Sequence, residues 1–194
     1  MAALKEELRR SALAVRAGIP ADDQQKAARC IVSRFFEVLS IKPGSVVAGY
    51  WPTRAEIDIR PLLHEIRKRG GRIVLPTVAD FKKPLIFREW LPETSMIDGR
   101  FGIKQPDPES SDAFVPSLLL VPMLAFDLKG HRLGYGSGFY DRTFASFEGV
   151  HDFKAIGMAY EVQMVDHVPT DEHDYRMDMI ITEQYIRTFE RRRL

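Results

Sequence analysis

The sequence lacks several features that would fix its class at once. It has one cysteine, Cys30, in 194 residues, so it can form neither an internal disulfide nor a thiolate metal cluster. Cys30 lies in an apolar helical stretch, where we expect a packed thiol. Lys and Arg number 28 against 27 Asp and Glu, and the net charge of +1 gives the whole chain no attraction to nucleic acid or to a membrane surface. We therefore expect neither partner, and any basic site must be local.

Long apolar runs are also missing. No segment reaches the roughly 18 consecutive apolar residues of a membrane-spanning helix, and the first residues, MAALKEELRR, contain no apolar region of the kind found in secretion signals. The chain is 45% hydrophobic and 28% charged, a composition that suits a well-buried core. Its 194 residues are enough for one such core and too few for two. We expect residues 1–194 to form a single domain, monomeric and cytoplasmic.

The order of the predicted elements indicates an α/β fold. Residues 45–50 and 72–76 read as strands on either side of a helix that begins near Asp58 and ends at Gly70, which is a βαβ unit. Further strands are predicted over 85–90, 117–122, 154–159 and 177–182, and further helices over 2–17, 20–39, 138–147 and the C-terminal residues after 182. Residues 92–114 look largely irregular. The sequence therefore predicts a mixed, mostly parallel sheet with helices on both faces, with the apolar run at 117–122 central in it.

The first helix carries a basic stripe. Lys5, Arg9 and Arg16 share one side, opposite an apolar face that includes Leu8 and Ala12, with Leu4 and Val15. From the pattern alone, a solvated face is the ordinary interpretation of such a stripe.

The most unusual stretch runs from Val121 to Thr143. Gly134, Gly136 and Gly138 alternate there, Arg132 precedes them, and Asp141 follows. Closely spaced glycines are costly in backbone entropy, and they permit a close approach of backbone N–H groups to an anion. A helix beginning at about Gly138 would add the positive end of its dipole. A mobile surface turn and a polyanion site are both compatible with the glycines, and the flanking charges favour the polyanion site.

Several familiar motifs are excluded. The glycine spacing differs from the dinucleotide fingerprint and comes late in the chain, and no GxxxxGK[ST] loop occurs. Ser137 abuts Gly136 and Gly138 directly, so it does not form a nucleophile elbow. The five histidines show no metal-ligand spacing. The fold is therefore Rossmann-like without being a dinucleotide-binding fold.

Phosphate is the anion that best fits the loop. Asp141 would repel phosphate oxygens unless a cation lay between them, and Mg²⁺ accepts one or two carboxylates together with phosphate oxygens. Asp178, at the start of a predicted strand, is the candidate second carboxylate, and Arg132 would neutralise the remaining charge, helped by Lys5 or Arg9. No side chain looks like an activated nucleophile, which points to phosphoryl transfer from ATP directly to a bound small molecule.

A second candidate region follows the strand at 45–50. Tyr50, Trp51 and Glu56 come at the carboxyl end of that strand, where parallel sheets bind ligands. An aromatic pair beside a carboxylate could hold a flat heterocycle and accept its N–H hydrogens. Trp51 could equally pack over the edge of the sheet, with Glu56 as a solvated loop acid.

VPMLAFDLKGHRLGYGSGFYDR at 121–142 resembles the signature of the 5-formyltetrahydrofolate cyclo-ligase family. KxxLR at 5–9, YxP at 50–52 with Glu56, LP at 75–76 and HDxxxDxIIT at 173–182 follow the family pattern in order. The resemblance implies that ATP and Mg²⁺ drive the conversion of 5-formyltetrahydrofolate to 5,10-methenyltetrahydrofolate, with ADP and phosphate as co-products. In that reaction the formyl oxygen attacks the γ-phosphate and N10 then closes the ring as phosphate leaves.

The resemblance also assigns roles to residues. It implies that Arg132 and Asp141 are catalytic, that Asp141 and Asp178 hold the metal, and that Glu56 contacts the folate. The implied ATP contacts are Lys5, Arg9, Arg132, Leu133, Gly134, Tyr135, Gly136, Ser137, Gly138, Phe139 and Tyr140, and the implied substrate contacts are Tyr50, Trp51, Glu56 and Tyr140. Ser137, Phe139 and Gln105 depart from residues common in the family, which leaves the side-chain contacts of Phe139 open.

Two alternatives to this enzyme are kept. One is a non-catalytic module of the same fold that binds nucleotide or folate, for which loss of Arg132 or Asp141 would be the sequence mark; both are present. The other is a kinase-like enzyme that acts on a different N-formyl or amide substrate.

Overall fold

The computed structural model describes residues 1–190, and its four α-helices agree closely with the sequence pattern. The helices are α1 (Ala2–Ala17), α2 (Ala21–Val38), α3 (Arg60–Lys68) and α4 (Phe139–Phe147), with short 3₁₀ turns η1 (Arg100–Gly102) and η2 (Glu161–Gln163). In α2 the buried side chains recur at helical spacing, at Ala27, Ile31 and Phe35. Every helix within residues 1–190 is too short or too polar to cross a lipid bilayer.

The main sheet has seven strands in the order β11-β10-β9-β6-β1-β2-β3. Their bounds are β1 (Val46–Ala48), β2 (Arg72–Thr77), β3 (Ile86–Glu89), β6 (Leu118–Pro122), β9 (Lys154–Met158), β10 (Met179–Ile181) and β11 (Ile186–Thr188). The five inner strands are parallel and the two edge strands, β3 and β11, are antiparallel to their neighbours. β6 is the middle strand, as its uninterrupted apolar sequence predicts.

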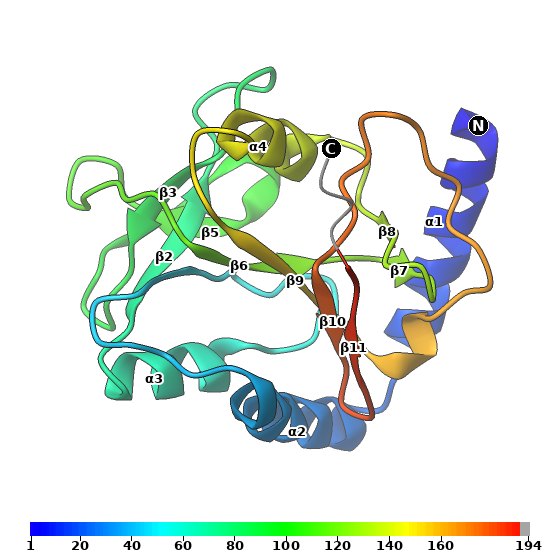
Figure 1. Cartoon of the computed structure of the whole chain (residues 1–194), viewed down its shortest axis with the longest axis horizontal. Helices are drawn as coiled ribbons and strands as arrows, with labels where there is room; N and C mark the ends of the chain where they lie inside the picture. The colour runs from blue at the N-terminus through cyan, green and yellow to red at the C-terminus, as the bar shows by residue number, and fades with distance from the viewer. Residues whose placement is uncertain (191–194) are drawn as a thin grey trace.

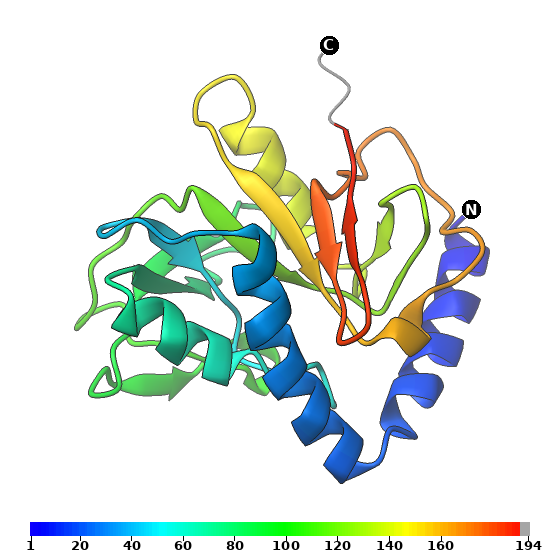
Figure 2. The same ribbon diagram turned by 60° about the horizontal axis from the view of Figure 1, so that its bottom comes forward.

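Helices cover both faces of this sheet, which confirms the predicted α/β class (Figure 1). α2 and α3 lie on one face, over a core that includes Ile31, Leu62 and Leu63. α4 lies on the opposite face, where Phe144 packs among Leu119 and Phe153 (Figure 2). The chain thus forms one α/β domain of three layers.

α1 stands apart from these layers, beside a small hairpin formed by β7 (Ala125–Phe126) and β8 (Arg132–Leu133) (Figure 2). Ala12 packs with Leu124 and Leu133 in a separate apolar cluster. The hairpin was not predicted, because its strands are only two residues long. Its turn is fastened by Asp127, whose buried carboxylate accepts hydrogen bonds from the backbone N–H groups of Lys129, His131 and Val168.

Two local predictions were wrong, and a third was incomplete. The residues after Thr182 form a tight turn and β11 where a helix was expected, because the Thr182 hydroxyl caps the turn by accepting a hydrogen bond from the N–H of Tyr185. Residues 191–194, the end of that predicted helix, lie outside the described residues. The segment 92–114 contains a two-stranded sheet, β4 (Met96–Asp98) with β5 (Lys104–Pro106). Cys30 is exposed, since the buried stripe of α2 passes through Ile31 instead.

Candidate functional site

A single large cavity lies beyond the carboxyl ends of β1, β2 and β6, between α1 and the start of α4. Its volume of about 2730 Å³ exceeds the roughly 300–1,000 Å³ of a site for one small molecule, so the cavity has room for more than one ligand of that size. All residues predicted to contact ATP or substrate line it: Lys5, Arg9, Tyr50, Trp51, Glu56, Arg132, Leu133, Gly134, Tyr135, Gly136, Ser137, Gly138, Phe139 and Tyr140. Asp141 lines it as well, and Asp178 does not.

The glycine loop connects β8 to α4. Gly136 and Gly138 have φ values of 94° and 66°, a left-handed backbone that favours glycine, and Gly138 is the N-cap of α4. A Cβ at Gly134 would meet no atom within 4 Å, so the backbone is open on that side. Within residues 1–190 the N–H groups of Gly136, Ser137 and Gly138 have no backbone acceptor. Free N–H groups at a helix start form a cradle for an anion.

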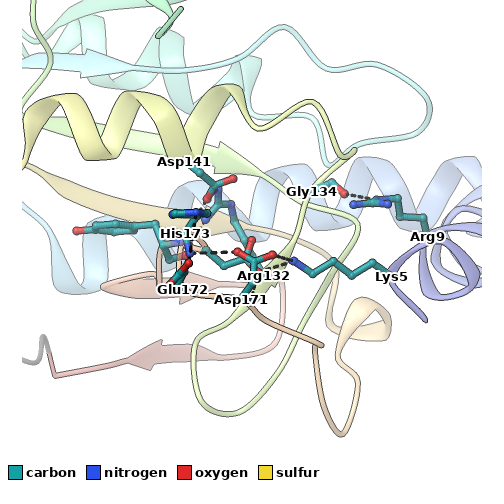
Figure 3. A network of polar contacts seen from close by, with 10 residues as sticks. Lys5, Arg9, Arg132, Gly134, Asp141, Asp171, Glu172 and His173 are labelled. Carbon is teal, nitrogen blue, oxygen red and sulfur yellow. Dashed lines mark hydrogen bonds and ion pairs between the residues drawn. The ribbon is translucent and has the colours of Figure 1, made fainter. Parts of the chain in front are cut away.

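Arg132 and Asp141 form the charged centre of the cavity. Arg132 is 8% exposed, and its guanidinium donates to Asp141 Oδ1 at 2.6 Å and to the backbone oxygen of Tyr175 at 2.7 Å. The backbone N–H of Tyr175 donates to the same Asp141 oxygen at 3.2 Å. The pair is therefore held in one geometry by the segment before β10, as Figure 3 shows for the two side chains.

Two cations of α1 reach this centre, so the solvated interpretation of the basic stripe was wrong for them. Arg9 donates to the backbone oxygen of Gly134 at 3.0 Å. Lys5 lies 2.9 Å from a carboxylate oxygen of Asp171 and 2.5 Å from one of Asp174 (Figure 3). Partial burial acts to lower the pKa of Lys5, but the two carboxylates outweigh it and raise the pKa.

Arg16, the third cation of the stripe, is buried instead of exposed. Its side chain turns inward between α1 and the loop, with 1% of the residue exposed, and donates to Tyr135 and to two backbone oxygens. Leu4 and Val15, expected in the core, are exposed. The buried face of α1 is thus centred on Ala12 and Arg16, and not on the predicted apolar face that includes Leu4 and Val15. Sequence reasoning missed Arg16 because an arginine on a helix is normally solvated.

Glu56 lines the same cavity as the glycines and is 8% exposed, which excludes the solvated-acid interpretation. It accepts hydrogen bonds from the Tyr135 hydroxyl at 2.6 Å and from the backbone N–H of Thr53 at 2.8 Å. Burial raises the pKa of Glu56, and these two hydrogen bonds with the nearby Arg16 charge partly offset that rise.

The aromatic residues predicted to contact substrate with Glu56 differ in whether their polar groups and rings already have partners in the protein. Tyr50 is 3% exposed and its hydroxyl donates to the backbone oxygen of Ile57 at 3.0 Å, so this group is already used. Trp51 packs edge to face on Trp90, with ring centroids 6.0 Å apart, and also lines the cavity. The hydroxyl of Tyr140 is buried with no hydrogen-bond partner within residues 1–190, which suits a contact with a ligand.

The predicted partner of Asp141 at a metal, Asp178, is not brought to the cavity. Its carboxylate accepts a hydrogen bond of 2.7 Å from the backbone N–H of Ala155, at the beginning of β9. The acids of the segment before Tyr175 that line the cavity are Asp171, Glu172 and Asp174. Within residues 1–190, no three His, Cys, Asp or Glu side chains form a ready-made metal cluster.

The three residues that depart from the resembled family pattern, Ser137, Phe139 and Gln105, each make a defined contact in the structure. Phe139 stacks on Phe81, with ring centroids 6.4 Å apart, and Ser137 uses its backbone oxygen to accept a hydrogen bond from Arg142. The side-chain oxygen of Gln105 accepts a weak hydrogen bond from the backbone N–H of Val78. All three lie at the rim of the cavity next to the segment before β3.

Comparison with known proteins agrees with the geometry. A family model described as the 5-formyltetrahydrofolate cyclo-ligase family matches residues 1–183. A 5-formyltetrahydrofolate cyclo-ligase of Haemophilus influenzae is 29% identical over 174 residues, covering 88% of this chain and 92% of its own. One from Mycolicibacterium smegmatis is 31% identical over 146 residues, covering 72% and 74%. The NMR structure of Aquifex aeolicus 5,10-methenyltetrahydrofolate synthetase matches with a TM-score of 0.77 and 29% identity, over 98% of this chain and 95% of its own.

Proposed function

Since the chain belongs to the 5-formyltetrahydrofolate cyclo-ligase family, we propose that it closes 5-formyltetrahydrofolate to 5,10-methenyltetrahydrofolate with the conversion of ATP to ADP and phosphate. One observation carries the proposal: the open glycine cradle and the buried acid Glu56 face the same cavity, which has room for a nucleotide and a folate together. A non-catalytic module has no need to place two such sites against each other.

In the proposed reaction the formyl oxygen forms a bond to the γ-phosphorus as the bond to the β,γ-bridging oxygen breaks and ADP leaves. N10 then attacks the activated formyl carbon, the carbon–oxygen bond to phosphate breaks, and N10 loses its proton. The N–H groups of the loop hold the phosphate oxygens, and Arg132 neutralises the charge that moves onto them. Catalysis by alignment and charge neutralisation requires no protein nucleophile.

Glu56 is the residue that orients the folate. As a buried carboxylate it accepts hydrogen bonds from the N–H groups of a flat heterocycle, and Trp51 lines the cavity beside it. Tyr140, in the first turn of α4, lines the same cavity, and its hydroxyl, which has no hydrogen-bond partner within residues 1–190, is available to either substrate.

Mg²⁺ fits this site as an ion shared between protein carboxylates and phosphate, since no all-protein cluster exists within residues 1–190. Asp141 is one proposed ligand, and Asp174 replaces Asp178 as the second, because Asp174 lines the cavity one residue before Tyr175, whose N–H binds Asp141. The ion would neutralise phosphate charge during transfer.

The test is the appearance of the methenyl absorbance when the protein meets 5-formyltetrahydrofolate, ATP and Mg²⁺ together. Omission of any one component should abolish the signal. Calorimetric binding of folate or ATP without turnover would support the non-catalytic module instead, and ATP hydrolysis that ignores the folate would support the kinase-like alternative.

A further inference from the structure

A continuous hydrogen-bonded chain links α1 to the substrate acid through the nucleotide loop. Arg16 Nη2 donates to the Tyr135 hydroxyl at 2.7 Å, and that hydroxyl donates to Glu56 Oε1 at 2.6 Å. Tyr135 belongs to the glycine loop by sequence, yet its hydroxyl is bonded to Arg16 of α1 and to Glu56.

The direction of the chain is fixed by its first member. A guanidinium only donates hydrogen bonds, so the Tyr135 oxygen must accept from Arg16 and its proton must point to Glu56. Glu56 therefore acts as an acceptor in this pair, and its remaining acceptor capacity is held in one orientation by the Thr53 N–H on its other oxygen.

Arg16 also fastens the turn that carries Glu56. Arg54 and Ala55, directly before Glu56, have φ values of 49° and 58°, a left-handed conformation that is unfavourable for residues other than glycine. Arg16 Nη2 donates to the backbone oxygen of Arg54 at 2.8 Å. The strained turn is thus tied to a buried cation on another element. This contact explains why the side chain of Arg16, on α1, is buried with 1% of the residue exposed.

We infer that Arg16 and Tyr135 are positioning residues of the substrate subsite: together they orient Glu56 as an acceptor for the N–H groups of the folate ring. The inference rests on the proposed function for the identity of the substrate. It assigns to Tyr135, a residue of the nucleotide loop, an effect on folate binding instead of ATP binding.

The charge of Arg16 has a second consequence. The titratable and charged groups around Glu56 are Arg16 from α1, Tyr135 from the loop, Tyr140 from α4, Tyr50 after β1, and Arg54, which lies over the Tyr135 ring. Among those that act on Glu56, Arg16 is the cation that favours the ionised carboxylate. Loss of Arg16 should therefore raise the pKa of Glu56 further, so that folate binding weakens at a higher pH than in the wild type.

The experiment measures binding of 5-formyltetrahydrofolate and of ATP by calorimetry, and the KM of each in the methenyl assay, for wild type, Tyr135→Phe, Arg16→Met and Arg16→Lys. Tyr160→Phe is the matched control, because that hydroxyl is buried without a hydrogen-bond partner among residues 1–190 and lies outside the cavity lining. Tyr135→Phe keeps the ring and should weaken folate affinity about tenfold, as expected for a lost hydrogen bond to a charged acceptor, with ATP affinity within about twofold of wild type.

Arg16→Met should weaken folate affinity at least as much and move the acidic limb of its pH profile upward by about one pH unit, whereas Arg16→Lys should retain the pH profile. Unchanged folate affinity in Tyr135→Phe, or equal losses for ATP and folate, would overturn the inference. A wild type that binds folate and forms no methenyl product would refute the proposed function, and the calorimetric comparison would still decide the role of Tyr135.

Discussion

The two ends of the cavity hold their charges in opposite ways. At the proposed nucleotide end, Lys5 forms an ion pair with Asp174, and Arg132 forms one with Asp141. These carboxylates compete with phosphate for the two cations. At the substrate end, Glu56 is buried and bound by a hydroxyl and a backbone N–H. In the proposed function, ATP binding therefore requires these ion pairs to rearrange, whereas the proposed substrate end is already organised for its ligand.

Asp141→Asn should give the largest effect, because it removes the charge that faces Arg132 while keeping the shape of the side chain. We expect the rate of methenyl formation to fall about 1,000-fold, with the thermal unfolding temperature almost unchanged. Full turnover by this variant would show that the nucleotide end does not depend on the Arg132–Asp141 pair.

The acids of the HDxxxD motif provide the next test. Asp174→Asn should lower kcat about 100-fold and raise the Mg²⁺ concentration needed for half-maximal rate, since Asp174 lines the cavity. Asp178→Asn should stay within about twofold of wild type, because Asp178 lies outside the cavity lining and its carboxylate accepts a hydrogen bond from the Ala155 N–H at the start of β9. The opposite ranking in a Mg²⁺ titration would restore Asp178 as the metal ligand.

Glu56→Gln sharpens the contrast from the substrate end. The amide keeps one acceptor oxygen but loses the charge, so the KM for 5-formyltetrahydrofolate should rise about tenfold while the KM for ATP changes little. Steady-state kinetics with each substrate varied at a saturating level of the other measure this. A matching rise in the KM for ATP would mean that the two ends are not independent.

The same contrast explains what the sequence could predict. β6 and the start of α4 at Gly138 follow from local patterns: an uninterrupted apolar run and a glycine-rich turn before helical spacing. Lys5, Arg9 and Glu56 were recognised through the family motifs, and the structure brings them to one cavity.

What the sequence could not predict depends on long-range packing. The inward turn of Arg16 requires acceptors from Met123, Arg54 and Tyr135, none of them near it in the chain. Of the two acids of the HDxxxD motif, Asp174 lines the cavity and Asp178 does not. The motif alone could not distinguish them, because the pairing of β10 with β9 places Asp178 beside the Ala155 N–H. The C-terminal strand β11 likewise forms by antiparallel pairing with β10, a contact that the local sequence pattern does not reveal.

The smallest expected effect concerns the ion pairs that ATP must replace. Asp171 is half exposed and bound to Lys5 at 2.9 Å, and Asp174 holds the same ammonium at 2.5 Å, so Asp171→Asn should remove one of the two carboxylates that compete with phosphate for Lys5 and lower the KM for ATP about two- to threefold, an effect that fades in high salt. Glu172→Gln is the matched control, because Glu172 is almost fully exposed and its ion pair is with His173. An increase in the KM for ATP in Asp171→Asn would mean that Asp171 holds Lys5 in its binding position, and the nucleotide end would then be as preorganised as the substrate end.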